Sequence, residues 1–182
     1  MFVLLIGPKG SGKSHIGHTL EKQLGILFFH VEPLWMNYYA ECQASGRQPV
    51  ISEGIARVHP LIADALRTHE HVCVETTGAS AEIMNDLLSL THRSNILIAR
   101  ISAPLELCLE RIATRDQTNQ ILMDVEAIRK VYVLSDSLEL RPDLRLENVQ
   151  LTEGEIISLF KSALTLPSSG PRRAGSAAHV KH

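Results

Sequence analysis

The eight residues Gly7-Pro8-Lys9-Gly10-Ser11-Gly12-Lys13-Ser14 constrain the fold more than any other part of the chain. They fit the pattern G-x-x-x-x-G-K-[ST] at every fixed position. Residues 1–6, just before them, form an unbroken apolar run that is typical of a buried parallel strand. Ile16, Leu20 and Leu24 follow at a spacing of four, which predicts one face of a helix. A strand, a glycine-rich loop and a helix in this order predict a phosphate-binding loop.

The residue types in this loop suit a bound polyphosphate. Gly7, Gly10 and Gly12 have no Cβ, so phosphate oxygens can approach the backbone. The loop N–H groups and the positive end of the helix that starts near Lys13 both favour an anion. We expect Lys13 to reach the β- and γ-phosphates and the Ser14 hydroxyl to ligate Mg²⁺. All eight residues are therefore candidates for nucleotide binding; the alternative is a glycine-rich turn that fits the pattern by chance.

Composition excludes several other classes of protein. The chain has 182 residues, enough for one stable domain, and is 45% hydrophobic and 21% charged. Its net charge of −2 gives no indication of a nucleic-acid or acidic-membrane surface. The three cysteines and nine histidines show no disulfide or metal-ligand spacing, so a cytoplasmic protein is the simplest interpretation. The apolar start is too short for a signal peptide, and no stretch has the length of a membrane span.

Further apolar runs alternate with helical patterns along the chain. Strands are predicted at 26–31, 71–75, 95–101 and 144–149, and this alternation favours an α/β fold with a mainly parallel sheet. Ligands of such sheets bind at the carboxyl ends of the strands. Glu32 and Glu75 each come at the predicted end of a strand. For Glu75 we expect a hydrated Mg²⁺ beside Ser14 as partner, although a lysine beside a half-exposed strand end is the alternative.

Residues 33–70 read as a helical insertion beside the phosphate site, where an acceptor substrate could bind. Trp35, Tyr38 and Tyr39 fall on one helical face, which either stacks on a ring of the acceptor or forms the core of the insertion. A second apolar face follows the break at 46–49; its members are Val58, Leu61, Ile62, Ala65 and Leu66. Arg57 contacts either an anionic acceptor or solvent.

Residues 112–128 are interpreted as a lid. Arg111 and Arg115 are four residues apart, near the end of a helix that starts at Pro104, and the polar residues 116–120 follow them. Two arginines beside such a loop could clamp a transferring phosphoryl group. The alternative is a solvated helix end whose basic charge suits the helix dipole.

Helix signals complete the chain. Gly25 is expected to end the first helix, Ser80 to cap a helix over 81–90, and Asp124 to precede a helix over 125–138. Thr152-Glu153-Gly154-Glu155 predicts a capping box at the start of a last helix, which closes the domain near residue 165. Residues 166–182 are rich in Pro, Ser, Gly, Ala and basic residues and are expected to be a disordered tail.

From about Phe2 to Leu164 these features resemble the small P-loop kinases, such as shikimate, gluconate and adenylate kinases and the polynucleotide-kinase-like ATP-binding domains. The resemblance rests on residues 7–14, on the acidic strand ends and on Leu-Glu-Arg-Ile-Ala-Thr-Arg-Asp at 109–116. It implies a three-layer P-loop NTPase fold with a five-stranded parallel sheet in order 2-3-1-4-5. It also implies an acceptor-binding insertion after strand two, a lid after strand four, and a loop near 148–152 that borders the adenine. Shikimate kinases carry Asp-x-Asp where this chain has His30-Val31-Glu32, and a glycine triplet where it has Thr76-Thr77-Gly78.

The resulting hypothesis is an ATP-dependent phosphotransferase acting on a small-molecule hydroxyl or a nucleotide. Lys13 and the loop amides would hold the phosphates, Ser14 and Glu75 would hold Mg²⁺, Glu32 would orient or deprotonate the acceptor, and Arg111 and Arg115 would stabilise the transferred group. A nucleotide-binding regulator without phosphotransfer is the alternative. A GTPase is less favoured, because N-K-x-D is absent and no D-x-x-G follows strand three. The sequence indicates neither the identity of the acceptor nor an oligomeric state.

Overall fold

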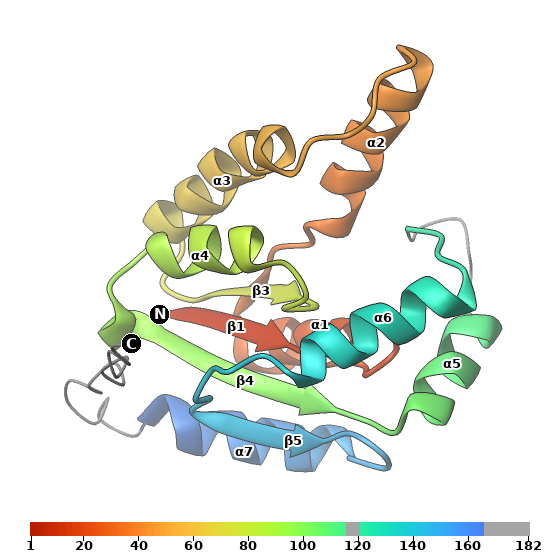
Figure 1. Cartoon of the computed structure of the whole chain (residues 1–182). Helices are drawn as coiled ribbons and strands as arrows, with labels where there is room; N and C mark the ends of the chain where they lie inside the picture. Colours follow the sequence, from red (N-terminus) through yellow and green to blue (C-terminus); the bar gives the residue numbers. More distant parts are fainter. Residues whose placement is uncertain (116–120, 166–182) are drawn as a thin grey trace, which may run out of the picture.

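The computed structural model describes residues 1–115 and 121–165, and in these residues five strands form one parallel sheet (Figure 1). Its order is β2-β3-β1-β4-β5, as the resemblance implied. The strands are β1 (Phe2–Ile6), β2 (Leu27–Phe28), β3 (Val72–Thr76), β4 (Ile96–Ser102) and β5 (Leu144–Glu147). The phosphate-binding loop leaves the carboxyl end of β1, the central strand.

Helices cover both faces of this sheet and make three layers (Figure 1). On one face lie α1 (Lys13–Leu24) and α7 (Glu153–Thr165); on the other lie α3 (Ile51–Thr68) and α4 (Ala81–Ser89). The helix α2 (Glu32–Ala44) projects away from the sheet, and α5 (Leu105–Thr114) lies beyond the carboxyl ends of the strands. The helix α6 (Val125–Asp136) and the short 3-10 helix Arg93–Asn95 complete the set in the described ranges.

Two hydrophobic cores explain why β1 is an unbroken apolar run. Val3 and Leu5 point into the core under α1 and α7, whereas Phe2, Leu4 and Ile6 point into the core under α3 and α4. Because both faces of a central parallel strand are buried, alternation disappears from its sequence. The five side chains are at most 2% exposed.

The capping signals act as expected. Gly25 ends α1 with φ 68°, in the left-handed region that favours glycine. The Ser80 hydroxyl accepts a hydrogen bond from the Ile83 amide, and the Asp124 carboxylate accepts one from Ala127. Thr152 donates its backbone N–H to Glu155 over 2.9 Å, and its hydroxyl accepts from the Glu155 amide, so the capping box is confirmed.

The second strand is shorter than predicted, which corrects the position of Glu32. The strand contains only residues 27–28, and Glu32 begins α2, with Pro33 in its first turn. Proline is favoured there because its fixed φ suits a helix start. Glu32 therefore lies at a helix N-terminus and not at the end of a strand. Of the second apolar face, Leu61 is 46% exposed and does not belong to the core.

Candidate active site

The phosphate-binding loop is held in a tight turn by its glycines. Gly10 and Gly12 have φ 83° and 93°, in the left-handed region. A Cβ on Gly10 would lie 2.4 Å from the Cys108 carbonyl oxygen, and one on Gly12 would lie 2.1 Å from Asn148 Nδ2. Only glycine fits both positions without displacing these neighbours, so the loop shape follows directly from its sequence.

Lys13 is almost fully buried at the start of α1, with 7% of its surface exposed. Its ammonium donates to the Pro8 carbonyl over 2.9 Å, which places the charge over the loop. Burial lowers the pKa of Lys13, and the negative charge of Glu75 acts in the opposite direction. Although the residue is almost fully buried, its side chain lines a cavity beside the phosphate-binding loop.

Glu75 is brought to this loop by strand register, since it lies opposite Leu5 of the central strand. Its carboxylate accepts from the Ser14 hydroxyl over 2.9 and 3.0 Å, and His30 Nε2 lies 3.5 Å from Oε1. Burial alone would raise the pKa of Glu75. The hydrogen bond from His30 and the charge of Lys13 outweigh it, so the pKa is lowered. Glu75 is thus an ionised, nearly buried carboxylate that pairs with Ser14 and His30. It is not the half-exposed strand end paired with a lysine that the sequence offered as the alternative.

A hydroxyl and a carboxylate in contact suit a hard cation. Mg²⁺ takes oxygen ligands and commonly uses one or two side chains, with waters and phosphates completing its shell. Ser14 and Glu75 match that donor set. The described residues contain no group of three His, Cys, Asp or Glu side chains able to hold a metal by themselves.

Glu32 is tied to the phosphate-binding loop at its third residue. Lys9 Nζ lies 3.2 Å from Glu32 Oε1 and donates to the Ile121 carbonyl over 2.6 Å. The Ile121 amide donates to the same Glu32 oxygen over 2.9 Å. Lys9 and Glu32 therefore form a partly buried ion pair. Together with Ile121, this pair connects the phosphate-binding loop, the start of α2 and the chain just before α6.

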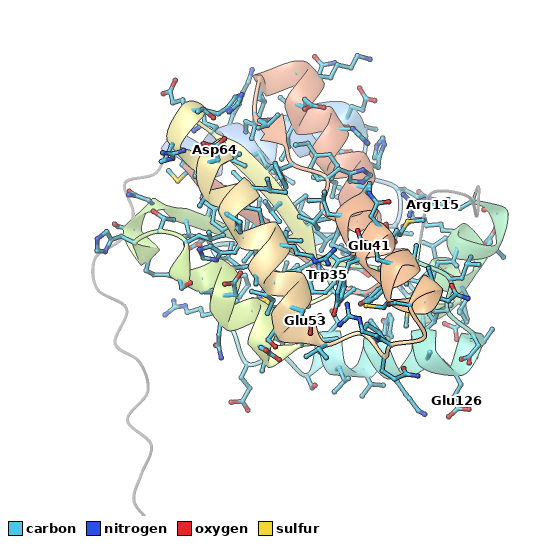
Figure 2. All side chains as sticks on the ribbon, turned by 90° about the horizontal axis from the view of Figure 1, so that it is seen from above. Trp35, Glu41, Glu53, Asp64, Arg115 and Glu126 are labelled. Atoms are coloured by element: carbon cyan, nitrogen blue, oxygen red, sulfur yellow. The ribbon has the colours of Figure 1, made fainter. Side chains whose placement is uncertain are left out.

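Arg111 and Arg115 lie at the end of α5 on the other side of the loop (Figure 2 labels Arg115). Arg111 donates to the Gly10 carbonyl over 3.5 Å and to the Val149 carbonyl over 3.3 Å. Both arginines line a cavity of about 480 Å³, together with Gly10, Gly12, His15, Thr114, Asn148, Val149, Gln150 and Leu151. Residues 116–120 of the expected lid, like the expected tail at 166–182, lie outside the described residues.

A second cavity, of about 360 Å³, lies between the phosphate-binding loop and helices α2, α3 and α4. Trp35 lies on its wall between α2 and α3 (Figure 2), where Gly54 leaves room for the ring. Tyr39 also lines this cavity, whereas Tyr38 is buried and donates to the Val50 carbonyl. The predicted aromatic face is thus divided between cavity wall and insertion core.

Comparisons with known proteins fit this geometry. The sequence matches the family model of the AAA domain over residues 2–131. This chain belongs to that AAA domain family. No curated protein matches the sequence.

Several solved structures similar to this AAA domain are kinases. An unliganded sugar kinase from Janibacter sp. HTCC2649 is 13% identical with a TM-score of 0.65, covering 90% of this chain and 93% of that one. Deoxyadenosine kinase from M. mycoides with dATP is 15% identical with a TM-score of 0.63, over 91% and 100%. Shikimate kinase from Aquifex aeolicus is 23% identical with a TM-score of 0.51, over 91% and 99%. The expected small P-loop kinase fold is therefore confirmed.

Three contacts in this AAA domain were not predicted from sequence. Asn148 is 6% exposed and donates to the Ser11 carbonyl over 2.9 Å, so it braces the phosphate-binding loop. Its only sequence signal is a polar residue directly after a strand. Asp86 and His59 pair at 2.7 Å beside the second cavity. Arg57 contacts Glu41 at 2.6 Å and stacks on Tyr38 at the exposed surface, so it takes the solvent-exposed alternative and does not line the cavity. No helix in the described ranges combines the length and apolar character that crossing a membrane requires.

Proposed function

We propose that this protein transfers the γ-phosphoryl group of Mg-ATP to a hydroxyl of a small-molecule acceptor. One observation carries the proposal: the phosphate-binding loop separates two cavities. Gly10 and Gly12 line the larger one, and Lys9 and Lys13 line the smaller one. A nucleotide in the first cavity would place its terminal phosphate at Lys13, where an acceptor in the second could reach it. Phosphoryl transfer depends mainly on such positioning.

The nucleotide side of the site follows from the larger cavity. The loop amides and Lys13 would hold the β- and γ-phosphates, and residues 148–151 would border the adenine. Ser14 and Glu75 would hold Mg²⁺, which, when bound, neutralises charge on the phosphate oxygens. Arg111 and Arg115, which line the same cavity, would stabilise charge on the transferred group.

On the acceptor side, Glu32 would take part in proton transfer. It lines the smaller cavity, beside Lys13. In the reaction the acceptor oxygen attacks the γ-phosphorus, the bond from that phosphorus to the β,γ-bridging oxygen breaks, and ADP leaves. The hydroxyl proton passes to Glu32 or, through it, to solvent. Its present contact with Lys9 keeps the carboxylate oriented, with one oxygen engaged.

The proposal is tested by ADP release in a screen of sugars, hydroxy acids, nucleosides and nucleotides. With an active acceptor, Lys13→Ala should abolish turnover, whereas Lys22→Ala, an exposed lysine on the same helix, should not change it. Arg115→Ala should lower kcat more than it weakens ATP binding. Equal losses in both quantities would contradict the role given to Arg115, and an active Lys13→Ala enzyme would contradict the proposal.

The alternative of a regulator has one specific observation in its favour, because Glu32 is already engaged by Lys9 and Ile121. A regulator would gain thermal stability from ATP but phosphorylate no acceptor in the screen. Comparing ATP with GTP in the same thermal measurement tests the nucleotide preference, and the proposal expects ATP to be the stronger stabiliser.

A further inference from the structure

We infer that the occupant of the smaller cavity is an uncharged, ring-bearing alcohol that also carries an N–H donor. The inference rests on the proposed function only for calling this molecule an acceptor. The cavity holds about 360 Å³, within the roughly 300–1,000 Å³ of small-molecule sites. Its walls are mostly apolar; they include Ile55, Val58 and Ile62 of α3, Val74 of β3, and Ile83 and Leu87 of α4. A sugar acid would bury its hydroxyls against these side chains without partners.

Charge in the cavity argues against an anionic acceptor. No arginine is among the described residues that line it, and its two lysines are already engaged. Lys9 binds Glu32 and the Ile121 carbonyl, and Lys13 faces the phosphate-binding loop. Three carboxylates, those of Glu32, Glu75 and Asp86, also line the cavity. A carboxylate or phosphate on the acceptor would therefore meet more negative than positive charge in a largely apolar space, which is costly.

Two groups of polar side chains line the cavity from different elements. Glu32 and Lys13 line it beside the phosphate-binding loop, where a reacting hydroxyl belongs. Asp86 belongs to α4 and pairs through Oδ1 with His59 Nδ1 at 2.7 Å. An ionised carboxylate has about four lone-pair sites, so Asp86 can accept a further hydrogen bond from an N–H group of the acceptor. The rings of Trp35 and Tyr39, which also line the cavity, suit a planar ring.

Trp35 gives a direct measure of occupancy because it is the single tryptophan of the chain. We would titrate thymidine, 2-phenylethanol, shikimate and gluconate against the full protein and record tryptophan emission. Saturating ADP keeps the larger cavity filled, and without ATP the signal does not depend on turnover. Thymidine has a ring, hydroxyls and an N–H donor; 2-phenylethanol lacks the donor. The expected order of affinity is thymidine, then 2-phenylethanol, with both carboxylates weakest.

The role of Asp86 is tested by Asp86→Ala. This change should weaken thymidine binding about tenfold, the loss of one hydrogen bond to a charged group, and leave 2-phenylethanol binding unchanged. Asp64→Ala is the matched control, because Asp64 is an exposed residue of α3 that pairs with Arg67 (Figure 2). An equal loss for both probes would contradict the donor requirement.

The inference is overturned if shikimate or gluconate binds as tightly as thymidine, or if neither neutral probe changes Trp35 emission. Binding of the neutral probes without phosphorylation of any hydroxyl compound by ATP would support the ligand class and contradict phosphotransfer. The two proposals can therefore fail separately.

Discussion

Replacing Gly54 by alanine tests the packing that forms the wall of the smaller cavity. Gly54 lies in the first turn of α3, and a Cβ added there would lie 2.0 Å from Trp35 Cζ3 and 2.4 Å from Cη2. Both distances are far below contact between carbon atoms, so the indole ring has to move. Neighbouring rings limit that movement, because the Trp35 centroid lies 5.9 Å from that of Tyr39 and 6.3 Å from that of Tyr38.

The magnitude follows from two opposing terms. Alanine in place of glycine in a helix normally stabilises a protein by roughly 0.5–1 kcal/mol. Overpacking by one carbon costs about 1–3 kcal/mol. The overpacking term is the larger at a 2.0 Å approach, so we expect Gly54→Ala to lower the free energy of unfolding by about 1 kcal/mol. The displaced ring should also change the emission of the only tryptophan and weaken ligand binding in the cavity.

Gly154→Ala supplies the matched control. Gly154 is exposed in the first turn of α7, and no atom lies within 4 Å of an added Cβ. The same chemical change there should be neutral or stabilising, and it should leave Trp35 emission as it is. Urea denaturation followed by circular dichroism measures both variants against the parent. If Gly54→Ala stabilises the protein as much as Gly154→Ala does, then the ring does not fill the space above Gly54 and the description of the cavity wall is wrong.

Three further predictions concern the phosphate-binding loop. Asn148→Ala leaves the Ser11 carbonyl without its buried donor, so it should cost about 1–3 kcal/mol in urea denaturation and weaken ATP binding in calorimetry. Glu75→Gln, like addition of EDTA to the parent, should remove most of the Mg²⁺-dependent part of ATP binding while Mg²⁺-free binding persists. Without metal or nucleotide, His30 has a pKa above its ordinary 6.5 because Glu75 accepts its hydrogen bond, and Glu75 has one below 4.5 despite its burial. The His30 contribution to stability is complete below 6.5 and disappears as pH rises through the folded-state pKa, whereas the Glu75 contribution disappears as pH falls below 4.5. The Tm difference between parent and His30→Gln should therefore be largest between these values and shrink at alkaline pH; a difference that grows above neutrality would contradict the pairing.

The loop and the sheet were predictable because each depends on local sequence. Gly10 and Gly12 adopt backbone angles that other residues rarely take, and the strand before them is buried on both faces. Parallel register then fixes Glu75 beside Ser14, since strands that end together bring their last residues to one edge. In this part of the molecule, the positions of the side chains therefore follow mostly from the order of residues along the chain.

The acceptor side was less predictable because tertiary contacts decide it. Glu32 looked like a strand end, but a two-residue edge strand and a proline in the next turn put it on a helix. Its partner Lys9 comes from the loop, where the pattern alone suggested phosphate binding. Asp86 carries no motif at all, and only the packing of α4 against α3 brings it to the cavity. The positions of such residues depend on which helices pack together, and the spacing of residues along the chain does not reveal that packing.

The contact between Ser14 and Glu75 separates two possible arrangements at the proposed metal site. The Ser14 hydroxyl has one proton and two acceptor lone pairs, and its proton is directed at Glu75. Its lone pairs therefore remain free for a cation, and the Glu75 carboxylate that accepts this hydrogen bond keeps the hydroxyl in that orientation. His30 also contacts this carboxylate, with Nε2 3.5 Å from Oε1. We therefore propose that Ser14 would ligate a nucleotide-bound Mg²⁺ directly, while Glu75 would orient the hydroxyl and supply negative charge without leaving its present partners.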